Sequence, residues 1–452
     1  MKHSEVQITE GSLAKNILIF SIPLALSNLL QVLFNMSDIA VVGQFAGSLA
    51  LGSVGSCATL VSLFTGLLIG MGGGINAIAA RYMGAGDRES VKRTVHTAFL
   101  LSLIYGIVVM IFGLFTVKGI LGILGTKEEL MQGAVLYMKV YLIGTPALAL
   151  YNFGNGILSA SGDSKRSLYY LLAAGILNIL LNLFFVIVCK LSVLGVALAS
   201  AISQYLSAGL VLLHLFRSKK DYSLSFADMK ITPAIFKNIF ALGISGALQN
   251  AIFAVANLFI QSAVNSFDTT MVEGNSAAAN ADSLIYDIMN AFYIACTTFM
   301  AQNYGAGNRE RVMKSYKICL IYSFSIAFVL GLFLRFFGTS FLMLFTREPE
   351  VIEAGLKRLG IMAFSYCFSA FMDNTIAASR GLGRTAVPTV IVILGSCVFR
   401  IVWIYTIFAH FRTIPSLYLL YIFSWGITAT LEIICFLHYY NKQVKNMAKT
   451  EA

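Results

Sequence analysis

One stretch of the chain, SLYYLLAAGILNILLNLFFVIV at residues 167–188, has no charged side chain anywhere along it. A helix that crosses the hydrocarbon core of a membrane needs about 20 predominantly apolar residues. A strand of a transmembrane β-barrel would be about ten residues long and would alternate in polarity. The stretch is too long and too continuously apolar for such a strand, so it predicts a membrane-spanning helix.

Similar segments recur along the whole chain. Hydrophobic residues make up 58% of the sequence and charged residues 12%, whereas soluble domains average about 45–50% apolar and about 25% charged. This composition excludes a soluble globular protein and predicts an all-α membrane protein with twelve transmembrane helices. The predicted spans are residues 16–40, 51–80, 92–116, 129–159, 167–189, 193–216, 236–264, 277–302, 313–337, 352–379, 387–408 and 415–438.

Most of the 32 basic residues lie in short loops on one side of the predicted membrane. They gather at Lys2 and Lys15, after the second, fourth, sixth, eighth and tenth spans, and at Lys442, Lys445 and Lys449. An excess of Lys and Arg marks cytoplasmic loops, so both termini are predicted to be cytoplasmic. The net charge of +11 is scattered rather than arranged in one stripe, so no nucleic-acid partner is predicted. The polar N-terminal stretch MKHSEVQITEGSLAKN lacks the pattern of a cleaved signal peptide.

Three landmarks occur twice, in the same order, which indicates an internal duplication. The paired segments are NILIFSIPLALSNLLQVLFN (16–35) with NIFALGISGALQNAIFAVAN (238–257), RYMGAGDRESVKR (81–93) with QNYGAGNRERVMK (302–314), and SASGDSKRS (159–167) with ASRGLGRTA (378–386). The repeated GAG segments are expected to be helix-ending glycine turns. They lack the GxxxxGK[ST] pattern and the preceding strand of a phosphate-binding loop.

The duplication predicts two lobes of six helices each. An even number of spans gives both halves the same topology, so an axis along the membrane normal should relate them. The predicted division is an N-lobe at 1–216, a cytoplasmic linker at 217–237 and a C-lobe at 238–452.

Motifs of enzymatic chemistry are missing from the sequence. There is no GxSxG or HExxH pattern, and the seven cysteines form no CxxC pair. The five histidines lie near span ends or termini, where interfacial or solvated roles are expected. The chain is therefore predicted not to be an enzyme.

One acid stands alone in the first span, in LFNMSDIAVVG at 33–43. A charged side chain at mid-bilayer costs about 2.5–3.5 kcal/mol on insertion scales, so such a residue usually faces the protein interior and marks an ion or substrate path. Asn35 lies one turn before Asp38, Asn178 and Asn182 share a helix face in the fifth span, and Ser200 lies in the sixth. These oxygen ligands suit a small cation such as Na⁺, and they equally suit hydrogen bonds between helices.

Further acids fall within or near the later spans. Asp287 lies in the eighth span beside Tyr286, Asn290 and Tyr293. An acid flanked by aromatic rings suits an organic cation, although a structural hydrogen bond is the competing interpretation. Structural and functional roles are both open for Asp373. Glu432, close to the cytoplasmic end of the last span, is expected to be interfacial and solvated.

Proline interrupts two of the predicted spans. Pro23 lies in the first span and Pro146 in the fourth. Membrane helices tolerate proline but often bend there.

Taken in order, these features resemble the multidrug and toxic compound extrusion (MATE) transporters, a likeness that covers nearly the whole chain. It rests on twelve spans in two halves, a proline-containing first span ending NMSDIAVVG, the paired GAG(D/N)RE turns, and the SGDSKRS and RGLGRTAVP segments. The likeness is to the bacterial branch of DNA-damage-inducible-type and staphylococcal multidrug pumps.

The resemblance implies two lobes around a central cleft and alternating access in a multi-pass protein of the bacterial inner membrane. It implies export of cationic or amphiphilic drugs against an inward H⁺ or Na⁺ gradient, with antibiotic resistance as the outcome, no other cofactor, and a monomer in contact with membrane lipids. Asp38 matches the first-span acid of the family, the expected coupling residue, and Asn178 and Ser200 match polar ligands. Asn182 stands where several relatives have Asp, which puts the ion and its stoichiometry in doubt. Gln249 lies near the place where another branch has Glu.

Two other functions compete with drug export. A lipid-linked oligosaccharide flippase of the same superfamily would be expected to carry more Arg and Lys in its spans, where Arg400 is the main exception here. A channel would favour a symmetric pore of several subunits, whereas this chain duplicates its own halves. Asp38 has no acidic counterpart in the second half, where Ile260 or Gln261 takes its place, and this asymmetry favours a functional role.

Overall fold

The computed structural model describes residues 6–444, which form helices and loops without a strand. The helices of the first half are α1 (Leu13–Phe45), α2 (Ser48–Ser56), α3 (Ala58–Gly84), α4 (Arg88–Ile123), α5 (Glu128–Ile143), α6 (Thr145–Ala160), α7 (Ser164–Leu183), the π-helix η1 (Phe184–Val188) and α8 (Ser192–Arg217). After the 3₁₀ turn η2 (Phe226–Asp228) come α9 (Pro233–Val264), α10 (Thr269–Gly305), α11 (Arg309–Leu342), α12 (Pro349–Gly381), α13 (Ala386–Val392), η3 (Ile393–Val398), α14 (Phe399–Trp403), η4 (Ile404–Phe408), α15 (Ala409–Phe411) and α16 (Ile414–Val444). The prediction of an all-α protein is confirmed.

Every predicted span is helical, but fewer than twelve are apolar enough to count as spans on their own. Within the described residues, ten helices are long and apolar enough to cross a membrane, and the bent pair α5 and α6 makes an eleventh. The remaining predicted span is α12, which carries Glu350, Glu353, Lys357, Arg358, Asp373 and Arg380. Arg358 is buried, whereas Glu353 and Lys357 are exposed, so these residues lower the mean hydropathy of α12 without placing the whole helix in the protein interior.

The prolines have different effects in the two spans. Helix α1 continues through Pro23. The α5–α6 pair bends by 45° at a break next to Gly144, and Pro146 follows in the first turn of α6. The missing N–H of proline is tolerated there because the first turn of a helix has no partner for it. The expected bend at Pro146 is confirmed.

The chain divides into two compact units. Of the described residues, unit 1 comprises residues 6 and 26–247, and unit 2 comprises residues 7–25 and 248–444. The divisions fall inside α1 and α9, and the predicted lobe boundaries stay a prediction. Lys2, Lys445 and Lys449, on which the predicted cytoplasmic termini partly rest, lie outside the described residues.

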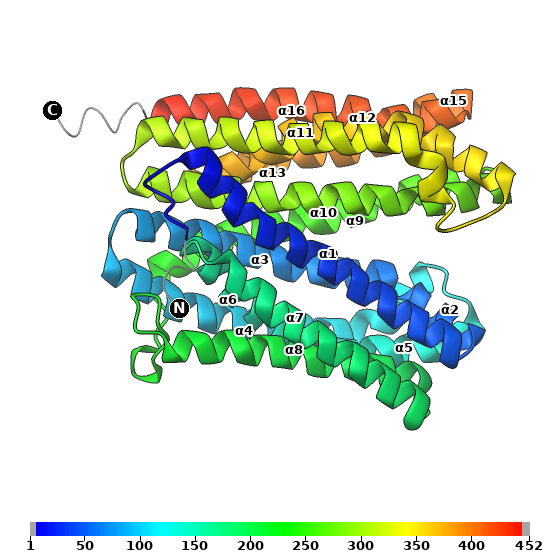
Figure 1. Ribbon diagram of the computed structural model, residues 1–452, viewed down its shortest axis with the longest axis horizontal. Coiled ribbons are helices and arrows are strands. Elements are labelled where there is room, and N and C mark those ends of the chain that lie inside the picture. Colours follow the sequence, from blue (N-terminus) through cyan, green and yellow to red (C-terminus); the bar gives the residue numbers. More distant parts are fainter. Residues whose placement is uncertain (1–5, 445–452) are drawn as a thin grey trace. The chain divides into compact units, whose positions relative to one another are not determined.

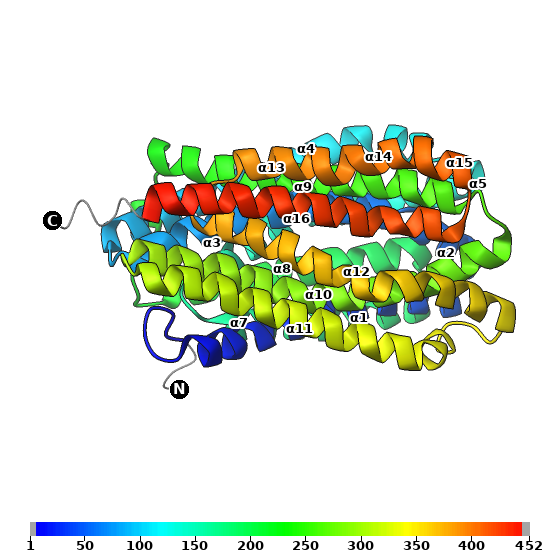
Figure 2. The same cartoon turned by 90° about the horizontal axis from the view of Figure 1, so that it is seen from above.

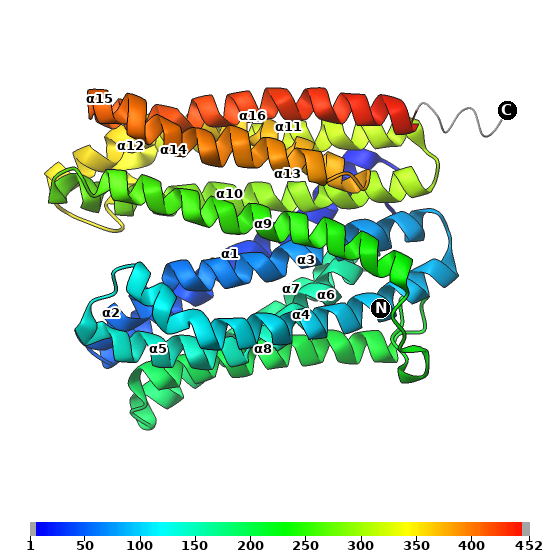
Figure 3. The same ribbon diagram turned by 180° about the vertical axis from the view of Figure 1, so that it is seen from behind.

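In unit 1, α4 packs beside α5 and α6, and α8 packs beside α5, α6 and α7 (Figure 3). In unit 2, α10, α11 and α12 run side by side, and α16 lies along α12 (Figure 1). The short segments α13, α14 and α15 follow one another alongside α16 (Figure 2). Each unit is therefore a bundle with its own core.

The repeated glycine segments end helices in both halves, as predicted. Gly86 follows α3 with φ of 68°, and Gly307 follows α10 with φ of 74°, a left-handed backbone that glycine adopts without steric cost. Asp87 then caps α4 by accepting from the Ser90 N–H at 3.0 Å, and Asn308 caps α11 by accepting from the Arg311 N–H at 3.2 Å. The repeated motif is thus a helix stop followed by a helix start.

Small residues allow α3 and α6 to approach closely. A Cβ on Gly156 would lie 2.8 Å from the Gly72 carbonyl oxygen, which is backbone and cannot rotate away. We expect Gly156→Ala to lower the free energy of unfolding by about 1–3 kcal/mol, because overpacking forces the helices apart. Thermal unfolding of the purified protein in detergent measures the effect.

The matched control for this variant is Gly209→Ala in α8. A Cβ there has no neighbour within 4 Å. Alanine should stabilise that helix by about 0.5–1 kcal/mol. Equal melting temperatures for the two variants would contradict close packing at Gly156.

Candidate functional site

The second half of α1 brings Asp38 against α7 and α8 in unit 1. Its carboxylate is buried, with 8% exposed. One oxygen accepts from the Asn182 amide at 2.5 Å, and the other accepts from the Ser200 hydroxyl at 3.0 Å. Three helices distant in sequence therefore meet at one acid.

The hydrogen bonds around Asp38 run in one direction. The Asn178 amide donates to the Ser200 oxygen at 3.4 Å, and the Ser200 hydroxyl donates onward to Asp38. The Asn182 amide nitrogen donates both to Asp38 and to the Asn178 oxygen, the latter at 3.2 Å. Donors thus converge on the carboxylate from both sides. The structure brings together four of the five predicted ion-coupling residues.

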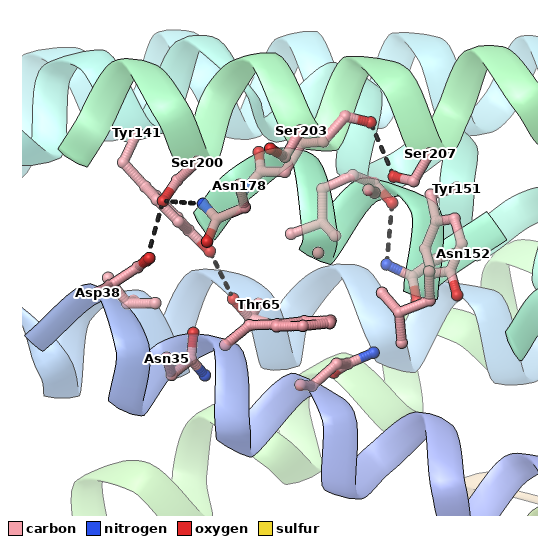
Figure 4. A pocket seen from close by; sticks show the side chains of 18 of the residues that line it. Asn35, Asp38, Thr65, Tyr141, Tyr151, Asn152, Asn178, Ser200, Ser203 and Ser207 are labelled. Atoms are coloured by element: carbon pink, nitrogen blue, oxygen red, sulfur yellow. Dashed lines mark hydrogen bonds between the residues drawn. The ribbon is translucent and has the colours of Figure 1, made fainter. Parts of the chain in front are cut away.

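A cavity of about 170 Å³ opens beside this cluster within unit 1. Asn35, the fifth predicted residue, lines it together with Asp38, Asn178 and Ser200. Asn35 is exposed, and it does not join the hydrogen bonds that the other four form in the described part of the chain. Figure 4 shows Asn35 on α1, one turn from Asp38, with Ser200 and Asn178 on the opposite wall.

Aromatic side chains form much of the same wall. Tyr137, Tyr141 and Tyr151 line the cavity, and the Tyr141 hydroxyl lies 3.0 Å from the Thr65 hydroxyl (Figure 4). Sequence reasoning missed these residues. They lie in the fourth predicted span, where a tyrosine carries no signal that distinguishes a cavity wall from the core. Their rings add an apolar, polarisable surface next to the acid.

A π-helix begins directly after the cluster. Helix α7 ends at Leu183, one residue past Asn182, and η1 continues from Phe184 to Val188. π-helical turns are rare and frequently occur at functional sites. The widened turn cannot be read from the apolar sequence, which is continuous through this point.

The predicted residues of the second half lie in unit 2. The rings of Tyr286 and Tyr293 on α10 meet edge to face, with centroids 6.2 Å apart. Asp373 on α12 lies within electrostatic range of both tyrosines, as Asp287 does of Tyr286. The Ser369 hydroxyl donates to Asp373 at 2.6 Å. Both acids thus lie near Tyr286, and their role in substrate binding stays a prediction.

Two other residues predicted to bind substrate, Asn290 and Gln249, also lie in unit 2. Asn290 lies on α10 between the two tyrosines in sequence and is half-buried. Gln249 on α9 is buried, and its side-chain oxygen has no hydrogen-bond partner among the described residues. No described contact joins either residue to the tyrosine pair.

Two expectations about polar side chains near span ends are wrong. Glu432 is fully buried, and neither of its carboxyl oxygens has a hydrogen-bond partner among the described residues. The reason is its face of α16, where Thr428, one turn earlier, lies 2.9 Å from the Ser396 hydroxyl. His96 is likewise buried rather than interfacial, with 1% exposed.

A buried ion pair in unit 2 was also missed. Arg358 on α12 pairs with Asp282 on α10, and it donates to the Asn275 side-chain oxygen at 2.5 Å. The Arg358 guanidinium also lies over the Tyr418 ring, 5.3 Å from its centroid. Each charge lies inside a predicted span, and that position was the signal available in the sequence.

The side chains around Asp38 include no further carboxylate, imidazole or thiolate group that would complete a metal site among the described residues. Within residues 6–444, no three His, Cys, Asp or Glu side chains lie close enough together to hold a metal ion. In the hydrogen-bonded arrangement an amide N–H and a hydroxyl donate to the carboxylate. The Ser200 hydroxyl oxygen keeps lone pairs, and the Asn182 side-chain oxygen has no hydrogen-bond partner among the described residues.

Two stretches of the chain, residues 23–184 and 246–406, each match the MatE protein family. The two matches cover corresponding parts of the two predicted halves, which supports the internal duplication.

Individual relatives were also found. The chain is 28% identical to "Probable multidrug resistance protein YpnP" of Bacillus subtilis over 82% of this chain and 84% of the relative. It is 24% identical to "FAD transporter" of Shewanella oneidensis over 73% and 75% of the two chains. Among solved structures, "Outward-facing conformation of a multidrug resistance MATE family transporter of the MOP superfamily" superimposes with a TM-score of 0.90. That comparison covers 98% of this chain and 100% of the other, at 23% identity.

Proposed function

Because this chain belongs to the MatE family of membrane transporters, we propose that it exports cationic and amphiphilic drugs from the cytoplasm in exchange for protons. The protein is a multi-pass membrane transporter and not an enzyme. Relatives named as multidrug resistance and multidrug export proteins support drugs as the substrates. The proposed site of energy coupling is Asp38.

The observation that carries this proposal is the direction of the hydrogen bonds at Asp38, which are donated to its carboxylate. Asn182 and Ser200 both donate to the carboxylate, so its deprotonated form is satisfied without a counter-ion. A proton added to the oxygen that faces Asn182 would point at an amide N–H only 2.5 Å away. That contact must then break. A proton on this oxygen would therefore release a bond between α1 and α7, whereas a proton on the other oxygen could be donated to the Ser200 hydroxyl.

This release is a means of alternating access. A ligand shifts a conformational equilibrium only when it binds the two states with different affinity. The proton favours a state in which α1 has lost its bond to α7, and the drug favours the state in which Asp38 is charged. Each ligand thus drives the step that the other reverses.

The second-half acids are proposed to recognise the charge of the drug. Asp287 and Asp373, with the rings of Tyr286 and Tyr293, would attract an organic cation through charge and through the π faces. Asn290 and Gln249 would contribute hydrogen bonds.

The proposed setting is the inner membrane of a bacterial cell, where the protein works as a monomer surrounded by lipid. The basic loops after α3, α6, α8 and α10 would face the cytoplasm, following the positive-inside rule.

Transport of a diphosphate-bearing substrate is less well supported. Arg358 is paired with Asp282 and Asn275. Arg400 is 2% exposed and is stacked against the rings of Tyr421 and Trp425. Neither guanidinium is presented to a soluble anion, whereas diphosphate recognition relies on accessible Arg or Lys.

The function is tested with reconstituted vesicles loaded with ethidium. An inward proton gradient should drive export, and an equal Na⁺ gradient at uniform pH should not. Export driven by Na⁺ alone would overturn the proton assignment but keep the transporter. Vesicles that fail to export under either gradient would overturn drug export itself.

Charge recognition in unit 2 is tested by Asp287→Asn. We expect export of a permanently cationic drug to fall by about fivefold or more, since the attraction between two unit charges about 4 Å apart is worth about 1 kcal/mol even in water. Export of a neutral drug should stay within about twofold. An equal loss for both substrates would contradict cation recognition at Asp287.

A further inference from the structure

The segment that joins α8 to α9, residues 218–232, docks on unit 1 rather than hanging free. Tyr222 and Leu224 are buried, and the Leu224 N–H donates to the Leu215 carbonyl of α8 at 3.0 Å. The Phe226 ring stacks on Phe216 with centroids 4.6 Å apart. We call residues 218–232 the docked linker.

The docked linker is joined to α4 at His96. The His96 Nδ1 lies 2.7 Å from the Lys92 carbonyl oxygen, and the Ser225 N–H donates to the His96 Nε2 at 3.0 Å. A carbonyl oxygen only accepts, so Nδ1 must carry a proton. A backbone N–H only donates, so Nε2 must not. The docked geometry therefore requires the neutral imidazole with its proton on Nδ1.

Other contacts hold the rest of the docked linker to α4 without a histidine. The Thr232 N–H donates to the Thr97 hydroxyl at 3.0 Å, and that hydroxyl lies 3.4 Å from the Lys230 carbonyl oxygen. The Lys92 ammonium pairs with Asp228 at 2.9 Å. Arg88 of α4 also pairs with Asp221 of the linker at 3.5 Å. Among these described contacts between α4 and the linker, His96 supplies the imidazole.

The charges that face His96 come from its own helix and from the linker. Asp228 lies within electrostatic range of His96, and the Lys92 ammonium pairs with Asp228. The hydrogen bond from Lys92 also holds the pKa of Asp228 below its usual range, so this ion pair persists in mild acid. Of the helices packed along α4, α6 carries no charged side chain, and the others carry Arg81 (α3) and Glu128, Glu129 and Lys139 (α5).

We propose that His96 is a pH sensor that releases the docked linker when the imidazole gains a second proton. Histidine is the side chain whose charge ordinarily changes between pH 5 and 8. A proton on Nε2 would face the Ser225 N–H and turn a hydrogen bond into a contact between two donors. The docked state binds one proton fewer than the released state, so docking weakens as the pH falls.

Release of the docked linker would free the segment that enters α9. The docked linker leads directly into α9 at Pro233, the helix that passes from unit 1 into unit 2. In the duplicated second half, Lys317 stands at the place of His96. The histidine is therefore particular to the half that leads into the connecting segment. The expectation that His96 senses the pH of the cytoplasm rests on the proposed orientation of the protein. The release of the docked linker does not depend on that orientation.

Hydrogen exchange of the full-length protein in detergent tests the release. Peptides that contain Ser225 and Thr232 should lose protection as the pH falls from 7.5 to 5.5, by up to about tenfold for each pH unit after correction for intrinsic exchange. The turn at Gly307 provides a reference that should not change. Constant protection in the wild-type linker would overturn the proposal.

The variant His96→Gln separates the histidine from other titrating groups. Its side-chain oxygen can still accept from the Ser225 N–H, and it does not titrate. The linker should then stay protected across the whole pH range, and drug export should depend less steeply on cytoplasmic pH than in the wild type. A pH response of the Gln variant equal to that of the wild type would overturn the proposal. Loss of export with normal linker exchange would count against the transport function instead.

Discussion

Vesicles that contain the Asp38→Asn variant are expected to accumulate ethidium no faster than vesicles without the protein. Asparagine keeps the size of the side chain but cannot bind and release a proton. It also turns one accepting oxygen into an N–H donor that faces Asn182 or Ser200, both of which already donate at this position. The measurement is proton-gradient-driven uptake into everted vesicles, with the amount of folded protein verified by size-exclusion chromatography.

A matched control removes a carboxylate charge elsewhere on a helix. Glu310 pairs with Lys314 one turn along α11, and both side chains are exposed. Surface pairs of this kind contribute about 0–1 kcal/mol, so Glu310→Gln should transport at close to the wild-type rate. Gradient-driven uptake by Asp38→Asn at the control rate would remove Asp38 from the coupling mechanism and leave the fold assignment intact.

The cluster around Asp38 was predictable because its members are polar residues in spans that are otherwise apolar. A carboxylate, two amides and a hydroxyl in such spans must find partners inside the protein, since lipid offers none. Spacing placed Asn178 and Asn182 on one face, and both join the cluster. The same reasoning overestimated Asn35, whose spacing from Asp38 is correct but whose side chain lies along the cavity wall.

Other features depend on which face of a helix meets a neighbour, and a uniformly apolar sequence does not specify this. Tyr141 on α5 and Tyr151 on α6 line the cavity because both helices pack beside α8. Glu432 was expected in solvent because it lies near the end of a span, yet its face of α16 turns inward. Distance from the end of a span is a weaker guide to burial than the helix face.

The two duplicated halves differ most in their charged residues. The glycine turns at Gly86 and Gly307 recur with the same left-handed backbone, because both copies need a helix stop. Asp38 in unit 1 has no acidic counterpart, and the pair of Arg358 and Asp282 belongs to unit 2 alone. The shared architecture is thus carried by glycines and caps, and the charged residues differ between the halves.

The buried pair in unit 2 joins three helices through one guanidinium. Besides Asp282 on α10, Arg358 donates to the Asn275 carbonyl oxygen at 3.0 Å and to its side-chain oxygen. Tyr418 on α16 donates to that same side-chain oxygen at 2.5 Å. Burying two charges is expensive, and the attraction between them offsets the expense only while both are present. Loss of one partner leaves the other buried and unpaired.

Asp282→Asn should therefore lower the free energy of unfolding by about 3–5 kcal/mol, measured by chemical or thermal unfolding in detergent. The exposed pair of Glu353 and Lys357 on α12 supplies the control, because Glu353→Gln should cost about 1 kcal/mol or less. Replacing both partners, as Asp282→Leu with Arg358→Met, removes both charges and should recover most of the loss. A single Asp282→Asn variant as stable as the Glu353→Gln control would mean that water or a rearranged side chain already neutralises Arg358, and that the three helices are held by apolar packing alone.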